Sequence, residues 1–176
     1  MRIEREHVAA IVVDYQEKLV PVMNDKDILL HNSCMLLEGL KALDVPMVIT
    51  QQYTKGLGMT VQEIFDATGV TEYIDKISFT AYDCVKEKLR AKKFIIVCGI
   101  EAHICVLQTV IDLKEAGFVP VLVADCISSR KESDKQVALE RARQEGAIVT
   151  TYESLLFELL KVAGTETSKK IQKLIR

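Results

Sequence analysis

The sequence has neither an excess of one charge nor a long apolar run. Its 23 Lys and Arg residues nearly balance 25 Asp and Glu residues, which gives a formal net charge of −2. This balance offers no basic surface for nucleic acid, so we expect no nucleic-acid partner. No apolar run approaches the roughly 20 residues that a transmembrane helix requires, so we also expect no membrane partner.

The first ten residues lack the apolar core and the small-residue cleavage site of a secretory signal, so we expect a cytoplasmic protein. Paired cysteine spacing is missing as well. The five cysteines are Cys34, Cys84, Cys98, Cys105 and Cys126. Cysteines in a reducing compartment stay as free thiols, and buried ones behave as small apolar side chains.

Buried apolar runs alternate with amphipathic segments along the whole chain. The predicted strands cover residues 7–13, 46–50, 94–98, 119–124 and 147–150, and residues 71–80 fit a short strand around Ile77. The predicted helices cover residues 26–42, 83–91 with Asp83 as N-cap, 103–116, 133–144 and 152–162, with a helical turn at 60–65 and a loop at 51–58. We find no internal repeat and no low-complexity linker.

This alternation predicts one Rossmann-like α/β domain over residues 1–176, with a mostly parallel sheet of roughly six strands between two layers of helices. A helical tail at about residues 165–176 carries an apolar stripe of Ile171, Leu174 and Ile175. The stripe can dock on its own domain or on a neighbouring subunit, and the sequence leaves both possibilities open.

Four residues stand at the carboxyl ends of predicted strands, namely Asp14, Gln51, Gly99 and Asp125. Ligands of parallel α/β sheets bind beyond these ends, where the strand order switches. We therefore expect the functional site at this edge. Asp14 is either a helix N-cap or a site residue there, and Asp125 with Ser128 fits a local capping arrangement.

Cys105 lies in the first turn of the helix that begins near His103. The positive end of a helix dipole favours a thiolate, which makes Cys105 a candidate nucleophile. Asp14 is a candidate proton acceptor and Lys76 a candidate cation that keeps Asp14 ionised. A buried structural thiol, a capping carboxylate and a surface lysine would account for the same three residues.

Several segments, in the same order along the chain, resemble motifs of the isochorismatase-like cysteine hydrolases. GIEAHICVLQT at residues 99–109 is similar to the nucleophile signature, in which a cysteine ahead of a valine opens a helix. The other matching segments are VVDYQ at 12–16, TQQYTKGLGMTVQE at 50–63, KISFT at 76–80 and ADCISSR at 124–130. The tail, KKIQKLIR, resembles the ending of the isochorismatase domain-containing proteins, so the resemblance covers nearly the whole chain.

The resemblance implies an isochorismatase-like fold and a catalytic triad of Asp14, Lys76 and Cys105. It also implies a cis peptide bond between Ile100 and Glu101, which aims the Glu101 and Cys105 N–H groups at one oxyanion. Candidate residues for the wall of the substrate pocket are Gln16, Gln51, Tyr53, Phe79 and Ile100.

The resemblance implies a hydrolase that cleaves an amide-type C–N bond of a small molecule through a thioester on Cys105. Because Cys105 is present, we favour this amidase over the vinyl-ether hydrolysis of true isochorismatases, which needs no cysteine. A catalytically idle scaffold that binds a metabolite or a protein is the alternative. Relatives assemble as dimers or higher oligomers, so we expect a homo-oligomer.

Zinc-binding nicotinamidases of this superfamily carry an Asp and His residues after the second strand. Here that place reads Gln51, Gln52 and Tyr53, and the chain has only three histidines, His7, His31 and His103. Three metal ligands cannot be assembled plausibly from them, so we expect no metal and no cofactor. His103 is a candidate for the pocket lining, although a histidine at a helix N-terminus more often faces solvent.

Overall fold

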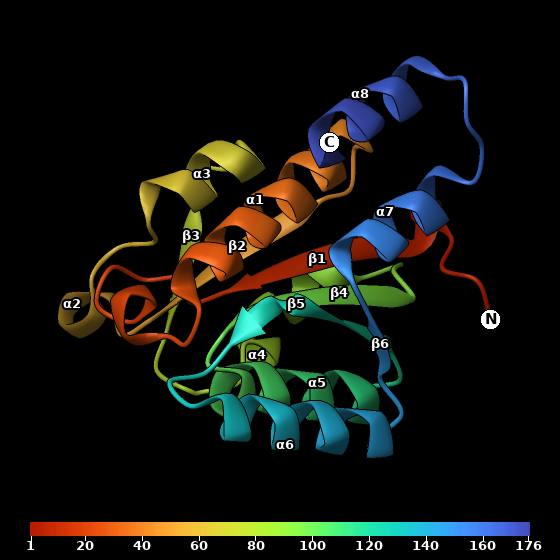
Figure 1. Ribbon diagram of the computed structural model, residues 1–176. Helices are drawn as coiled ribbons and strands as arrows, with labels where there is room; N and C mark the ends of the chain where they lie inside the picture. The colour runs from red at the N-terminus through yellow and green to blue at the C-terminus, as the bar shows by residue number, and fades with distance from the viewer.

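A computed structural model describes residues 1–176 and shows six strands in one parallel sheet between two layers of helices (Figure 1). The strands are β1 (Val8–Val13), β2 (Met47–Gln52), β3 (Tyr73–Lys76), β4 (Phe94–Ile100), β5 (Val119–Ser128) and β6 (Ile148–Thr150). Their order across the sheet is β3-β2-β1-β4-β5-β6. The order therefore reverses between β1 and β4, and a crevice for ligands is expected at their carboxyl ends.

Eight α-helices accompany the strands. They are α1 (Lys26–Ala42), α2 (Thr54–Leu57), α3 (Gln62–Thr68), α4 (Tyr82–Val85), α5 (Leu107–Glu115), α6 (Glu132–Gln144), α7 (Tyr152–Leu160) and α8 (Glu166–Ile175). Three 3₁₀ turns (Arg5–His7, Val20–Val22 and Lys86–Leu89) and a π-helical turn (Ala102–Val106) complete the chain. None of the helices combines the length and apolarity that a bilayer crossing demands.

Two apolar cores lie on opposite faces of the sheet, and β1 contributes to both of them. Val8, Ala10 and Val12 pack under α1, α3, α7 and α8, whereas Ala9, Ile11 and Val13 pack against α4, α5 and α6 (Figure 1). Successive residues of a strand point to opposite faces, so a strand covered on both sides must be apolar throughout. The uninterrupted apolar run of β1 is therefore a consequence of its central place.

The C-terminal helix α8 docks on its own chain, beside α1 and α7 (Figure 1). Ile171 is fully buried in the core beneath α1, and Leu174 and Ile175 are half-buried. Of the two arrangements left open by the sequence, the structure therefore shows the tail packed on its own domain.

The predicted helix at residues 83–91 is wrong in both extent and cap. The helix α4 is a single turn that begins at Tyr82, with Ala81 as N-cap, and a 3₁₀ turn follows it. The Thr80 hydroxyl accepts the Tyr82 N–H at 3.2 Å, so the chain turns before Asp83 is reached. The strand expected around Ile77 ends at Lys76, and Ile77 is exposed.

Other boundaries differ because of contacts that are distant in sequence. The strand β5 continues beyond residue 124 to Ser128, because Ile127 and Ser128 pair with Gly99 and Ile100 after a shift in register. The helical turn expected at 60–65 is α3, and the expected loop at 51–58 contains the end of β2 and the helix α2.

Gly99 makes the closest approach between β1 and β4. Its φ is +133°, and a Cβ atom at this position would lie 2.1 Å from the Val13 carbonyl oxygen. Only glycine has neither the steric penalty of this backbone conformation nor a side chain that would collide with β1.

We expect Gly99→Ala to lower the free energy of unfolding by about 3 kcal/mol or more, because it combines a disfavoured φ with a backbone clash. Gly117→Ala is the matched control, since Gly117 has φ +88° but no neighbouring atom within 4 Å of the added Cβ. That change should cost about 1 kcal/mol. Urea denaturation of both variants measures the difference, and equal losses would refute the close approach.

Candidate active site

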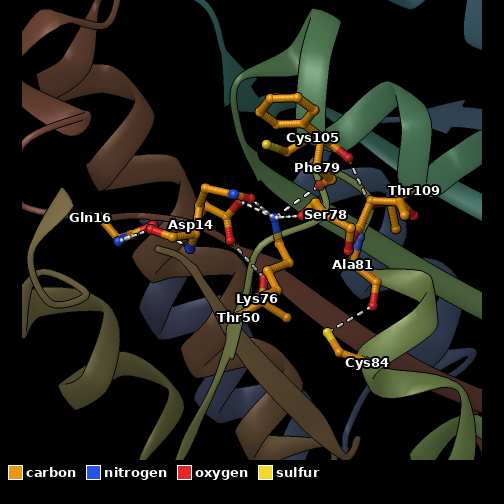
Figure 2. Close-up of polar contacts among 12 residues, drawn as sticks. Asp14, Gln16, Thr50, Lys76, Ser78, Phe79, Ala81, Cys84, Cys105 and Thr109 are labelled. Carbon is orange, nitrogen blue, oxygen red and sulfur yellow. Dashed lines mark hydrogen bonds and ion pairs between the residues drawn. The ribbon is translucent and has the colours of Figure 1, made fainter. Parts of the chain in front are cut away.

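Three elements bring Asp14, Lys76 and Cys105 together at the carboxyl edge of the sheet (Figure 2). Asp14 directly follows β1 and Lys76 is the last residue of β3, while Cys105 lies in the π-helical turn after β4. Asp14 Oδ2 lies 2.7 Å from Lys76 Nζ, and the two side chains are 0% and 1% exposed. The ion pair is therefore shielded from water and is little screened.

The ammonium of Lys76 has three acceptors besides Asp14. Nζ donates to Gln52 Oε1 at 2.7 Å, to the Phe79 carbonyl at 2.9 Å and to the Ser78 carbonyl at 3.2 Å. Asp14 Oδ2 lies 2.7 Å from this ammonium, and side-chain hydrogen bonds with Lys76 and Cys105 both lower the pKa of Asp14. The carboxylate is therefore within hydrogen-bond reach of the Cys105 thiol, whose proton it is placed to accept.

Burial raises the pKa of Asp14 above its ordinary value of 3.8, and the Lys76 ammonium lowers it by a smaller amount. The Thr50 hydroxyl, which donates to Asp14 Oδ1 at 2.8 Å, also lowers this pKa. A carboxylate with a raised pKa is a stronger base than one in water, which suits it to proton transfer.

Burial, followed by the negative charge of Asp14, raises the pKa of the Cys105 thiol to about 12. The Lys76 ammonium and a hydrogen bond from the Glu101 N–H oppose the rise but do not cancel it. The direction of this shift is opposite to the one expected from the helix dipole alone. The sequence showed the start of a helix beside Cys105, but not that the sulfur is buried next to a carboxylate.

The backbone around Cys105 is held in a defined shape. The peptide bond between Ile100 and Glu101 is cis, and the N–H groups of Ile104 and Val106 both donate to the Glu101 carbonyl. The Cys105 carbonyl accepts the Thr109 hydroxyl at 2.7 Å, and that hydroxyl in turn accepts the Ala81 N–H at 2.8 Å. These bonds tie the turn that carries the sulfur to the segment before α4 (Figure 2).

The side chain of Glu101 is also anchored. Its Oε2 accepts hydrogen bonds from the backbone N–H and the Nε–H of Arg130, both at 3.1 Å. A backbone hydrogen bond from Glu101 lowers the pKa of the Cys105 thiol. A donor beside the sulfur is close to the carbonyl group that the sulfur would attack. The oxygen of that group becomes the oxyanion.

Of the five residues expected in the pocket wall, Tyr53 and Phe79 are half exposed, at 50% and 54%. The other three are buried. Ile100 packs in the core, and Gln51 Oε1 accepts both the N–H and the hydroxyl of Thr60.

Gln16 is likewise occupied within the protein. Its Oε1 accepts the Gln52 N–H, and its Nε2 donates to the carbonyls of Gln52 and Gly58. Gln16 and Gln51 therefore hold the segment after β2 and do not present free amide groups to a ligand.

Two further expectations concern neighbouring residues. His103 is not simply solvent-facing, because its Nδ1 lies 2.8 Å from Ser129 Oγ. Asp125 and Ser128 do not cap each other's turn. Asp125 Oδ1 accepts the N–H of Tyr152 at the start of α7, and the Ser128 hydroxyl donates to the Asn24 carbonyl.

Gln52 is the site residue that the sequence analysis missed. It is the register partner of Lys76 in the β2–β3 pair, so knowledge of that pairing would have pointed to it. No group of three or more His, Cys, Asp or Glu side chains is arranged to hold a metal ion. At the end of β2, the amides of Gln51 and Gln52 are engaged in hydrogen bonds within the protein.

Residues 8–154 match the family model of the isochorismatase domain. The chain belongs to the isochorismatase family. It is 35% identical to isochorismatase domain-containing protein 2 of Danio rerio, over 99% of this chain and 89% of that one. It is 37% identical to the secreted isochorismatase effector Isc1 of Phytophthora sojae, over 94% and 82% of the two chains. The resemblance to the isochorismatase domain-containing proteins is thereby confirmed.

Solved structures share the architecture of this family member. The MAR1 ribonuclease of Caenorhabditis elegans superposes with a TM-score of 0.94 at 34% identity, over 99% of this chain and 92% of that one. The YcaC gene product of Escherichia coli, described as an octameric hydrolase of unknown specificity, has a TM-score of 0.90 at 23% identity, over 99% and 90%. The three-layer α/β/α fold with a parallel six-stranded sheet is thus confirmed.

The electrostatics of this isochorismatase-family site predict a neutral thiol at rest. We expect no ionisation of Cys105 between about pH 6 and pH 9, because its pKa is about 12. Asp14→Asn should lower that pKa, because it removes the repelling carboxylate and leaves the Lys76 ammonium in place.

Thiolate absorbance in the ultraviolet measures this, taken as the difference between each protein and the same protein carrying Cys105→Ala. A thiolate step near neutral pH in the unmodified protein would contradict the assignment, as would an unchanged titration in Asp14→Asn.

Proposed function

We propose that this protein is a metal-independent cysteine hydrolase that cleaves the C–N bond of a small amide-type substrate. One domain of residues 1–176 would carry the whole site. The observation that supports this most is the buried Asp14–Lys76 ion pair beside the Cys105 thiol. It provides a base, a charge that keeps the base ionised, and a nucleophile.

In the first half of the reaction, Cys105 is the nucleophile. Its sulfur bonds to the substrate carbonyl carbon while the S–H proton moves to the Asp14 carboxylate. Because the thiol is neutral at rest, proton transfer must accompany the attack. The carbonyl oxygen becomes an oxyanion, and the backbone N–H groups of Glu101 and Cys105 are its proposed donors.

The tetrahedral species then collapses. The C–N bond breaks, and the departing nitrogen takes the proton from Asp14, which leaves a thioester on Cys105. Water attacks this thioester and gives a proton to Asp14, the C–S bond breaks, and the proton returns to the sulfur. Lys76 remains an ammonium throughout and stabilises the carboxylate form of Asp14.

A catalytically idle scaffold is less consistent with the free energy that is needed to bury the charges of Asp14 and Lys76. Burying two charges is expensive, and a buried ion pair is often no more stable than apolar side chains of similar size. A protein that only bound a ligand elsewhere would gain nothing evident from Asp14 and Lys76 in the interior. A reaction that needs a base shielded from water beside a thiol would explain why the Asp14–Lys76 ion pair is buried.

We expect Cys105→Ala and Asp14→Asn each to reduce turnover by about 10⁴-fold or more, since each removes a group that takes part in every bond change. Both proteins should keep the circular dichroism and unfolding transition of a folded chain. Cys34→Ala is the matched control, because Cys34 lies half-buried on α1, away from the ion pair. Ammonia release from a panel of small amides measures the turnover.

Retained hydrolysis in Cys105→Ala would refute the nucleophile. Because a similar solved structure is described as a ribonuclease, the panel should include RNA. Cleavage of RNA without cleavage of any amide would overturn the proposed function.

Localisation and assembly stay predictions. We expect a cytoplasmic protein, although one relative is described as a secreted effector. We also expect a homo-oligomer, in line with the octamer described for the YcaC product.

A further inference from the structure

Gln52 joins the catalytic ion pair to the interior of the protein. Its side-chain Oε1 lies 2.7 Å from Lys76 Nζ, and its Nε2 donates to the Ile77 carbonyl at 2.7 Å. The orientation of this amide is determined by its partners. If oxygen and nitrogen were exchanged, NH₂ would face the ammonium and the oxygen would face a carbonyl, so both contacts would become repulsive.

The backbone of Gln52 is also fixed. The Gln16 amide accepts the Gln52 N–H at 2.7 Å and donates to the Gln52 carbonyl at 2.9 Å, so it brackets the residue on both sides. Gln16 is fully buried and Gln52 is 9% exposed. With two side-chain and two backbone atoms of Gln52 in hydrogen bonds, its amide has little freedom to move and holds the Lys76 ammonium in a defined position.

The neutral charge of Gln52 matters as much as its position. The groups that act on Asp14 are Lys76, Cys105 and the Thr50 hydroxyl, and the half-buried Cys84 thiol senses both charges of the ion pair. A carboxylate at residue 52 would compete for the Lys76 ammonium and place a second negative charge near Asp14. An amide orients the ammonium and adds no charge.

We propose that Gln52 is a positioning residue, which fixes the Lys76 ammonium against Asp14 and leaves its full positive charge to that carboxylate. Gln52 would not touch the reacting atoms. The effect of Gln52 on turnover rests on the proposed hydrolase function, whereas its effect on the titration midpoint of Asp14 is independent of any substrate.

The test is an NMR titration of the Asp14 side-chain carboxyl carbon in the ¹³C-labelled full chain, assigned by its absence in Asp14→Asn. Gln52→Glu should raise the Asp14 midpoint by roughly 1 pH unit, because a like charge disfavours ionisation. Gln172→Glu is the matched control, since Gln172 is an exposed residue of α8, and it should leave the midpoint unchanged. An unmoved midpoint in folded Gln52→Glu would overturn the inference.

Kinetics give a second readout through Gln52→Met, which keeps the volume and removes the acceptor for Lys76. We expect a kcat lower by about 10-fold or more with little change in KM, because the loss lies in the orientation of the base. An unchanged kcat would overturn the positioning role.

If Gln52→Met fails to fold, the pH dependence of kcat is measured for Gln52→Glu instead. The pH at which kcat falls on the acid side should then rise together with the Asp14 midpoint, and an unshifted acid side would overturn the inference. If the unmodified protein cleaves no amide while the NMR midpoint still moves, the proposed function fails and the inference about Gln52 stands.

Discussion

The site depends on an ion pair between Asp14 and Lys76 from which water is excluded. Two charges can stay in a protein interior only where hydrogen bonds replace their hydration, and here Thr50 serves the carboxylate while Gln52 and two backbone carbonyls serve the ammonium. This requirement explains why β1, β2 and β3 must end at the same edge. The strand order brings these strand ends together, and the polar residues there form the hydrogen bonds that stabilise the two charges.

The same environment determines the character of the nucleophile. Cys105 is 6% exposed and lies beside a carboxylate, and both features raise the pKa of its thiol. In the proposed mechanism, a neutral thiol with a buried base differs from a preformed thiolate, because the sulfur becomes nucleophilic only as Asp14 takes its proton. Such a site would restrict the reactivity of the thiol toward electrophiles that do not fit against the base.

Much of this arrangement could be predicted from the sequence. Apolar runs located β1 and β4, helical periodicity located α1 at its observed bounds, and the family resemblance singled out the three triad positions. The pairing of Lys76 with Gln52 could not be predicted, because it depends on the register of β2 and β3. The raised pKa of Cys105 and the internal hydrogen bonds of the Gln16 and Gln51 amides could not be predicted for a related reason. Burial is a property of the packed chain, and a residue at the end of a strand can face the interior or the ligand.

The central claim is that the Cys105 sulfur forms a covalent bond to the substrate. The most direct measurement is mass spectrometry of protein quenched with acid during the first turnover. The substrate joins the acyl group of the best amide in the panel to a good leaving group, so that the acyl-enzyme forms faster than water hydrolyses it. The account predicts a mass increase equal to the acyl group on the peptide that contains Cys105 and on none that contains another cysteine. Turnover at full rate with no acyl group on Cys105 would contradict it.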